Sequence, residues 1–247
     1  MPSSTPLWVA VLQGDGPGGF CLHVRERQVL SPRAVPKRKN DFLRGRMVGR
    51  GLACDVLGLD PQRIAIVPDE RGVPWIEYDD ARLAYSMSLS HTVGVAGAAI
   101  VKLPFRVGID VERPIDRPAA VIRGYFDMHE SEYCACGDAR EVGRRASEIW
   151  ALKEACLKVM GTGLRVPVSA VSVCSVGNRE EENGWRCARV VLSEEHFGDG
   201  WETIAWLRWM GDVVVVVAVA GERWGAGEVA LEVPRIIDTW TATAAHT

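Results

Sequence analysis

Two carboxylates lie two positions apart in the stretch GIDVE, residues 108–112, whose other members are apolar or glycine. In a β-strand, residues i and i+2 project to the same face, so Asp110 and Glu112 would lie side by side. Like charges placed in this way repel and raise each other's pKa unless a cation neutralises them. A divalent metal would relieve the repulsion, whereas a solvated strand end, with Arg106 and Arg113 as counter-charges, is the plainer alternative.

A third carboxylate occurs in WALKEACLK, residues 150–158, which has the composition of a helix. Glu154 and Lys158 are four residues apart and therefore share one helix face, while Lys153 directly precedes Glu154. An ordinary ion pair on a helix surface predicts the same spacing, so this stretch alone does not choose between the two interpretations.

A helix with one basic face is predicted over residues 35–57, where apolar residues recur at helical spacing. Arg38, Arg46 and Arg50 lie on rows four and eight residues apart, so that they point in one direction. A solvated face is the usual explanation of such a run, and an anion-binding face is the functional one. For Arg50, a pair with Asp55 or another local acid is a further alternative.

Two shorter stretches complete the set of candidate functional residues. LAYSMSLSHTVGVAGAAIV, residues 83–101, predicts two neighbouring central strands joined near Ser90 and His91, where a lone histidine is more often structural than functional. PDERGVPWI is rich in turn-forming residues and has Arg71 and Gly72 at its tip.

The elements that must position these residues fall into two similar groups. REVGRRASEIWALKEACLKVMG, residues 140–161, predicts a long helix, and AVSVCSV, RCARVVL, ETIAWLRWM and DVVVVVAVAG predict closing strands. Each half of the chain therefore offers strands and one long helix, which is compatible with two α+β lobes. After about Trp224 no strong pattern is found.

The glycine-rich stretch GDGPGG, residues 14–19, formally matches a dinucleotide-binding fingerprint. Such a fingerprint requires a helix directly after it, but a proline lies inside this one and FCLHV follows with strand-like composition. A hairpin loop is therefore the favoured interpretation.

The composition is that of a soluble globular protein, with 247 residues, 47% apolar and 25% charged residues. The net charge of −3 argues against a general nucleic-acid binder. The seven cysteines are scattered without a CxxC pair, so we expect reduced thiols. The N-terminus has no signal-peptide pattern and VVVVVAVA is too short to span a bilayer, which predicts a cytoplasmic protein with no membrane partner.

Taken in order, SLSHT, GIDVE, WALKEACLK and GTGLRVPVSAVSV resemble the 4'-phosphopantetheinyl transferases of the larger, Sfp-type class. The resemblance runs from about Val35 to about Val173 and is weaker over residues 1–30. It implies an α+β fold, with a pseudo-twofold pair of similar lobes, each a small, mostly antiparallel sheet packed on a long helix. The active site would lie at the lobe interface.

The expected domain organisation follows from this resemblance. We expect an N-terminal lobe over residues 1–105 that contacts the phosphates of coenzyme A. A C-terminal lobe over residues 106–224 would carry the metal site and the catalytic helix, and residues 225–247 would form a tail.

The resemblance also implies a reaction. The 4'-phosphopantetheine group of coenzyme A would pass to a serine of an acyl or peptidyl carrier protein domain, with release of adenosine 3',5'-bisphosphate. This step converts apo to holo forms of polyketide, nonribosomal peptide or fatty acid synthases. We expect a monomer that binds coenzyme A and carrier domains and no nucleic acid.

By the same resemblance, Asp110, Glu112 and Glu154 would hold Mg²⁺, with Mn²⁺ as an alternative, and the metal would also coordinate the pyrophosphate of coenzyme A. Hard oxygen ligands and substrate phosphate suit such an ion. Glu154 would receive the serine proton, and Lys158 would stabilise the charge on the leaving group. Lys153 is either a second phosphate contact or a surface lysine.

Phosphate contacts are implied for a group of residues from the N-terminal half. His91, with Ser90 beside it, would contact the coenzyme A phosphates. Arg38, Arg46 and Arg71 match positions where family members often carry phosphate-binding cations, and arginine forks suit terminal phosphates.

One segment departs from the family pattern. In YFDMHESEY, residues 125–133, either Glu130 or Glu132 holds the place of a family glutamate. The segment over residues 125–145 is the expected docking element, because carrier proteins are generally acidic and this segment is rich in arginine. Its arginines are Arg140, Arg144 and Arg145.

Two other functions remain open on the sequence. One is another Mg²⁺-dependent enzyme that cleaves phosphodiesters with the same three carboxylates, and the other is a coenzyme A-binding scaffold without turnover. A small trimeric holo-carrier synthase is disfavoured because the chain has about twice the length that one lobe needs. The motifs do not specify the carrier protein or the tolerance for acyl-coenzyme A.

Overall fold

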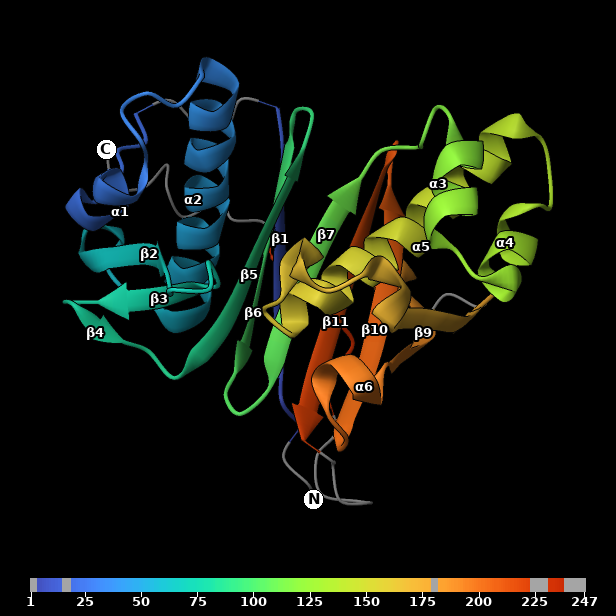
Figure 1. Ribbon diagram of the computed structural model, residues 1–247. Coiled ribbons are helices and arrows are strands. Elements are labelled where there is room, and N and C mark those ends of the chain that lie inside the picture. The colour runs from blue at the N-terminus through green and yellow to red at the C-terminus, as the bar shows by residue number, and fades with distance from the viewer. Residues whose placement is uncertain (1–3, 15–18, 179–181, 223–230, 238–247) are drawn as a thin grey trace.

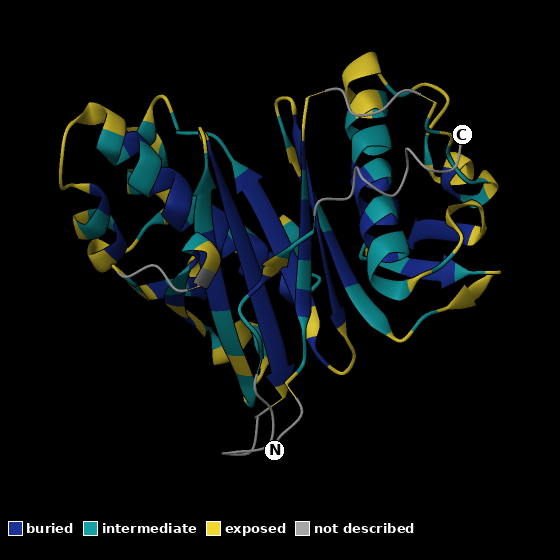
Figure 2. Cartoon of the chain, turned by 180° about the vertical axis from the view of Figure 1, so that it is seen from behind, coloured by how far each residue is buried: buried dark blue, intermediate teal, exposed yellow. Residues whose placement is uncertain are grey.

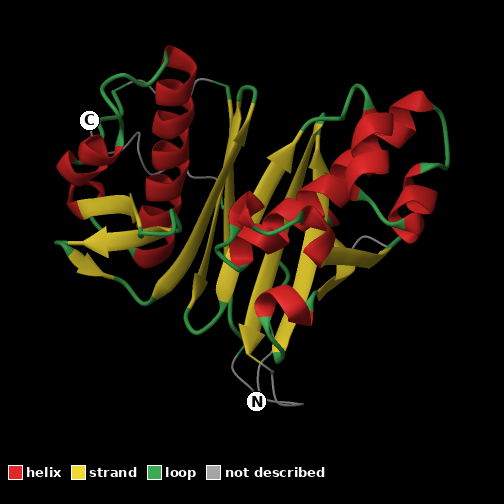
Figure 3. Cartoon of the chain, viewed as in Figure 1, coloured by secondary structure: helices red, strands yellow, loops and turns green. Residues whose placement is uncertain are grey.

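The computed structural model describes residues 4–14, 19–178, 182–222 and 231–237 (Figure 1). The chain forms two lobes, each with a sheet and a long helix, and a third, small sheet lies in the N-terminal lobe. Figure 3 shows that the strands form the middle of the molecule and that helices flank them on both sides. The predicted α+β class is confirmed.

The N-terminal lobe is built on a four-stranded sheet in the order β12-β1-β6-β5. Its strands are β1 (Leu7–Gln13), β5 (Tyr85–Thr92), β6 (Val95–Lys102) and β12 (Arg235–Ile236). Helix α2 (Pro36–Leu57) packs on this sheet through Val48 and Leu52, which are fully buried with Ile100. It begins with proline, whose missing N–H costs nothing at a helix start, and it is followed by Gly58, whose φ of 64° suits glycine.

Shorter elements complete this lobe. A three-stranded sheet of β2 (Ile64–Pro68), β3 (Pro74–Tyr78) and β4 (Ala81–Arg82) lies beside α2. It is preceded by helix α1 (Val24–Val29) and by a 3₁₀ turn over Pro61–Arg63.

The C-terminal lobe contains a five-stranded antiparallel sheet in the order β7-β11-β10-β9-β8. The strands are β7 (Arg106–Glu112), β8 (Val171–Val176), β9 (Arg186–Leu192), β10 (Trp201–Met210) and β11 (Val213–Glu222). Helix α5 (Ala139–Val159) lies on this sheet, accompanied by α3 (Pro118–Tyr125), α4 (Met128–Cys134) and α6 (Glu194–Phe197). Single 3₁₀ turns lie at Gly163–Arg165, Val168–Ala170 and Glu182–Gly184.

The apolar run in β11 has a direct structural explanation. Alternate residues such as Val214 and Val216 pack in the core beneath α5, while Val215 and Val217 pack in the core shared with the N-terminal sheet. Both faces of β11 are therefore buried, which explains why the strand lacks the apolar and polar alternation of a half-exposed strand. Figure 2 shows this continuous buried layer in the middle of the molecule.

Three predictions about local structure have different outcomes. Cys21–His23 are not a strand, and helix α1 follows them, capped by the His23 side chain, which accepts from Arg25 N. The loop predicted over residues 14–19 lies mostly outside the described residues. Part of the expected tail is the strand β12, which pairs with β1 in parallel.

Across the described residues, none of the helices has the length and apolar character needed to cross a membrane.

Candidate active site

The two lobes meet where strand β5 lies along strand β7, each at the edge of its own sheet. Serine hydroxyls on β5 accept hydrogen bonds from backbone N–H groups of β7, at every second residue of both strands. The bonds run from Val107 N to Ser86 Oγ (3.0 Å), from Ile109 N to Ser88 Oγ (3.1 Å) and from Val111 N to Ser90 Oγ (3.3 Å). Because strand residues alternate between faces, these serines form one row, which fixes the register between the lobes.

Helix α5 approaches β7 at Gly108 more closely than any side chain would allow. A Cβ at this position would lie 2.0 Å from the carbonyl oxygen of Ala155 and 2.8 Å from Val159 N. Gly108, Asp110 and Glu112 share one face of β7 by their spacing, so both carboxylates point toward α5. The glycine of GIDVE is therefore what brings the helix against the carboxylates.

Asp110, Lys158 and Ser90 contact one another in a closed triangle. Lys158 Nζ lies 2.6 Å from Asp110 Oδ1 and donates to Ser90 Oγ at 3.0 Å, and Ser90 Oγ donates to Asp110 Oδ1 at 2.8 Å. Lys158 also donates to the carbonyl oxygen of Ile109 at 3.1 Å. Asp110 is buried, and within the described part of the chain its second oxygen, Oδ2, has no hydrogen-bond partner.

The other two predicted carboxylates lie close enough to sense this cluster. Burial raises the pKa of Glu112 to about 7, and the charge of Asp110 adds to this effect while Lys158 opposes it. Burial also raises the pKa of Glu154, with Lys158 lowering it and Asp110 raising it. The structure thus places Asp110 and Lys158 in contact, with Glu112 and Glu154 close enough for their charges to interact.

This cluster suits a divalent cation in its chemistry. Its carboxylate oxygens are hard ligands, and Oδ2 of Asp110 is buried without a partner among the described residues. The carboxylates also repel one another, and a bound cation would relieve this repulsion. As the side chains lie, no group of three or more His, Cys, Asp or Glu among the described residues is close enough to hold a metal ion. The residues fit an ion such as Mg²⁺, which keeps water and substrate phosphate among its ligands.

A cavity of about 540 Å³ lies between the lobes and includes Lys158 in its wall. Its volume is in the range of small-molecule sites. Arg71 lies at its rim, where Nη2 donates to the carbonyl oxygens of Met160 (3.0 Å) and Gly161 (3.1 Å) at the end of α5. The other lining residues are Gly72, Val73, Pro74, Met87, Ser88, Leu89, Gly161, Thr162, Gly163, Leu164 and Arg165.

His91 lies at the end of β5, one residue beyond Ser90. Burial lowers the pKa of His91, and the charges of Lys158 and Arg38 lower it further, while Asp41 opposes them. The Nδ1 atom of His91 is 3.9 Å from Asp41 Oδ2. Arg38, Asp41 and Lys158 therefore all lie close enough to affect the charge of His91.

Two arginines of α2 are committed to packing instead. The Arg46 Nε donates to the carbonyl oxygen of Ile66 at 3.0 Å, and its guanidinium lies 4.0 Å from the centre of the Phe42 ring. Burial lowers the pKa of Arg46 to about 10, and the residue is not part of the cavity wall. Arg50 forms a buried ion pair with Glu26, which lies in α1.

Lys153 also differs in position from the expected phosphate contact. It is 1% exposed, and its Nζ lies 2.7 Å from Glu130 Oε1 and 2.5 Å from the carbonyl oxygen of Val171. Glu130 Oε1 also accepts from Val173 N at 2.8 Å. Lys153 thus faces the core, because α4 supplies a buried carboxylate for it.

These contacts distinguish the two glutamates of YFDMHESEY, because only Glu130 pairs with Lys153. Glu130 is buried, whereas the Glu132 side chain is 67% exposed. Sequence reasoning missed the link between Glu130 and Lys153. The spacing of Asp127 and Glu130 predicts the capping box at the start of α4, but it does not indicate the buried lysine partner.

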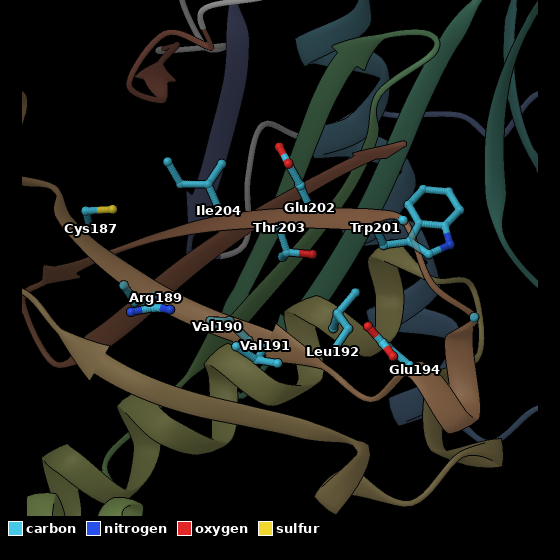
Figure 4. A pocket seen from close by; sticks show the side chains of 13 residues that line it. Cys187, Arg189, Val190, Val191, Leu192, Glu194, Trp201, Glu202, Thr203 and Ile204 are labelled. Atoms are coloured by element: carbon cyan, nitrogen blue, oxygen red, sulfur yellow. The ribbon is translucent and has the colours of Figure 1, made fainter. Parts of the chain in front are cut away.

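A second cavity, of about 550 Å³, lies where β9 and β10 diverge beside α6 (Figure 4). Arg189, Trp201 and Thr203 are among its lining residues. The residues of the Asp110 cluster do not line it, so the cavity between the lobes is the one connected to the candidate active site.

Fold and site together define a two-lobed α+β protein with a carboxylate and lysine cluster beside an interlobe cavity. The family model described as 4'-phosphopantetheinyl transferase superfamily matches residues 106–215, and one described as 4'-phosphopantetheinyl transferase N-terminal domain matches residues 25–101. The chain belongs to the 4'-phosphopantetheinyl transferase superfamily. Proteins of this family are transferases that use coenzyme A, generally with Mg²⁺, and act on carrier protein domains. A search of the curated proteins finds no match.

Proposed function

We propose that this chain transfers the 4'-phosphopantetheine group of coenzyme A to a serine hydroxyl of an acyl or peptidyl carrier protein domain. The observation that carries the proposal is the position of Lys158, which contacts Asp110 and also lines the interlobe cavity. The presence of both lobes in one chain supports the larger, Sfp-type class. Carrier domains of polyketide, nonribosomal peptide or fatty acid synthases are the proposed acceptors.

Coenzyme A would bind in the cavity between the lobes. Its negatively charged phosphates would lie toward Lys158 at the end of α5, with Arg38 and the imidazole of His91 nearby. Arg71 at the rim presents a guanidinium, whose fork suits a terminal phosphate.

Asp110, Glu112 and Glu154 would hold Mg²⁺, or Mn²⁺ in its place. The ion would supply charge neutralisation at the pyrophosphate and make the phosphorus more electrophilic. This chain's own contribution is to fix Asp110 with Oδ1 neutralised and Oδ2 free, and to keep the three carboxylates on facing surfaces of β7 and α5.

Transfer then requires a base and a group that stabilises the leaving oxygen. The serine oxygen would form a bond to the β-phosphorus while the bond from that phosphorus to the bridging oxygen breaks, releasing adenosine 3',5'-bisphosphate. Glu154 would take the serine proton, directly or through a water bound to the metal. Lys158, with 26% of its side chain exposed, would stabilise the charge on the leaving oxygen.

Intact-mass spectrometry of an apo carrier protein tests this proposal. Incubation with the enzyme, coenzyme A and Mg²⁺ should add one phosphopantetheinyl group to each carrier. EDTA, a carrier with alanine at the acceptor serine, and the variant Glu154→Gln should each prevent the addition. Hydrolysis of coenzyme A without carrier modification would instead indicate a phosphodiester-cleaving enzyme, and binding without any reaction would indicate a scaffold.

A further inference from the structure

Ser90 differs from the other serines of its row in what its hydroxyl contacts. Ser86 and Ser88 each accept a backbone N–H from β7. Ser90 accepts Val111 N and, in addition, contacts two charged groups of the candidate site.

These contacts use the full hydrogen-bonding capacity of the Ser90 hydroxyl. A hydroxyl offers one donor and two acceptor positions. The Ser90 hydroxyl donates to Asp110 Oδ1 at 2.8 Å and accepts from Lys158 Nζ at 3.0 Å and from Val111 N at 3.3 Å. Ser90 is also only 7% exposed. The geometry is therefore that of a residue that holds protein groups, and it leaves the hydroxyl no further position for a phosphate.

The Asp110 carboxylate is oriented by this arrangement. Ser90 and Lys158 both occupy Oδ1, while Oδ2 is buried and has no partner among the described residues. Without the hydroxyl, the carboxylate could rotate and Lys158 would lose one of its three contacts. Partners of metal-binding side chains commonly change metal affinity by about 10- to 100-fold when they are removed.

We propose that Ser90 is a positioning residue that crosses the lobe boundary to orient Asp110 and Lys158, and that it acts on divalent-cation affinity and turnover instead of coenzyme A affinity. The inference rests on the proposed function for its kinetic part. The cation-binding part stands independently, because it concerns the orientation of Asp110 alone.

The test compares Ser90→Ala with Ser86→Ala, which loses the same type of backbone hydrogen bond but touches neither charged group. Three quantities are measured: Mn²⁺ affinity of the free protein by electron paramagnetic resonance, coenzyme A affinity in EDTA by calorimetry, and kcat and KM for coenzyme A. Thermal unfolding confirms that each variant is folded.

For Ser90→Ala we expect Mn²⁺ affinity to fall about 10-fold or more. We expect kcat to fall with it. The affinity and KM for coenzyme A should stay within about twofold of the wild type, which is a smaller change than the loss of one hydrogen bond to a charged group would cause. Ser90→Thr, which keeps the hydroxyl, should restore Mn²⁺ affinity and kcat, and Ser86→Ala should match the wild type. Should Ser90→Ala not fold, Ser90→Cys replaces it, because the thiol keeps the size but is a weak donor and acceptor.

The proposal is overturned if the Ser90 variant weakens coenzyme A binding while Mn²⁺ affinity is unchanged, since the hydroxyl would then contact the substrate. It is also overturned if neither affinity changes, or if Ser86→Ala has the same effect on Mn²⁺. Absence of carrier modification by the wild type would refute the proposed function, and the Mn²⁺ titration would still decide the role of Ser90.

Discussion

Gly108 of β7 and Ala155 of α5 approach so closely that a Cβ on the glycine would lie 2.0 Å from the alanine carbonyl oxygen. No flexible side chain can move aside, since the opposing atom belongs to the helix backbone. The whole of α5 would have to shift, and with it Glu154 and Lys158.

Gly108→Ala should therefore impair both stability and activity. We expect a loss of about 1–3 kcal/mol or more in the free energy of unfolding, as for other overpacked cores, measured by urea denaturation. Carrier modification should fall strongly even where the protein is folded. Gly124→Ala in α3 is the matched control, because nothing lies within 4 Å of the added Cβ, and it should leave both quantities unchanged or slightly raise stability. A Gly108→Ala variant with normal stability would contradict the close approach.

The buried pair of Glu130 and Lys153 should contribute to stability without touching the reactants. Breaking it with Lys153→Met leaves a buried, unpaired carboxylate and should cost about 3–5 kcal/mol. Adding Glu130→Gln to that variant should recover part of the loss, because the unpaired charge is then removed. Urea denaturation of the two single variants and the double variant measures this coupling. A Lys153→Met variant with wild-type stability and a raised KM for coenzyme A would place the lysine at a phosphate instead.

A surface ion pair in α5 is the control for the buried pair of Glu130 and Lys153. Arg145 and Glu141 are 3.2 Å apart at partly exposed positions one helical turn from each other. Glu141→Gln should change stability by at most about 1 kcal/mol, since exposed ion pairs contribute little.

Glu112 should make the metal-free protein less stable as the pH rises. Its pKa is about 7 in the folded state against 4.5 in the unfolded chain, so between these values the folded state binds more protons. The corresponding stability is present below about pH 4.5 and is lost as the pH rises through 7, by at most about 3 kcal/mol. In EDTA, thermal unfolding of Glu112→Gln should show a smaller decline between pH 5 and pH 8 than the wild type. The exposed Glu195→Gln should follow the wild type, and parallel profiles for all three proteins would contradict the prediction.

Replacing Arg46 by alanine should affect stability, whereas replacing Arg71 by alanine should affect coenzyme A binding. Arg46→Ala removes a buried hydrogen bond to Ile66 O and the contact with Phe42, so it should lower stability by about 1–3 kcal/mol. Arg71→Ala removes a cation at the cavity rim and should raise KM for coenzyme A several-fold. Thermal unfolding and steady-state kinetics of both variants test this difference. A raised KM with unchanged stability for Arg46→Ala would bring that guanidinium into the binding site.

The sequence was sufficient where local spacing determines the structure. The period-two spacing of Asp110 and Glu112 and the four-residue spacing of Glu154 and Lys158 predict shared faces, and these faces do meet. The helix predicted over residues 35–57 is observed as Pro36–Leu57.

Contacts between segments far apart in the sequence could not be predicted from local spacing. Lys153 and Lys158 lie on one helix with similar composition around them, and only the fold shows that Glu130 faces the first and Asp110 the second. Similarly, the bond from Arg46 to Ile66 joins residues 20 positions apart, so no local pattern in α2 distinguishes this arginine from Arg38.

The position of β12 has a consequence for how the chain folds during synthesis. The N-terminal sheet takes its fourth strand from Arg235–Ile236, on the far side of the whole C-terminal lobe in the sequence. Although domains commonly fold as they leave the ribosome, this sheet cannot be completed until the C-terminal lobe and then Arg235–Ile236 have been made. A chain cut between β6 and β7 would leave β1 as an open edge in its first half. The two lobes are therefore not separable into a first and a second half, and we expect them to reach the native state together.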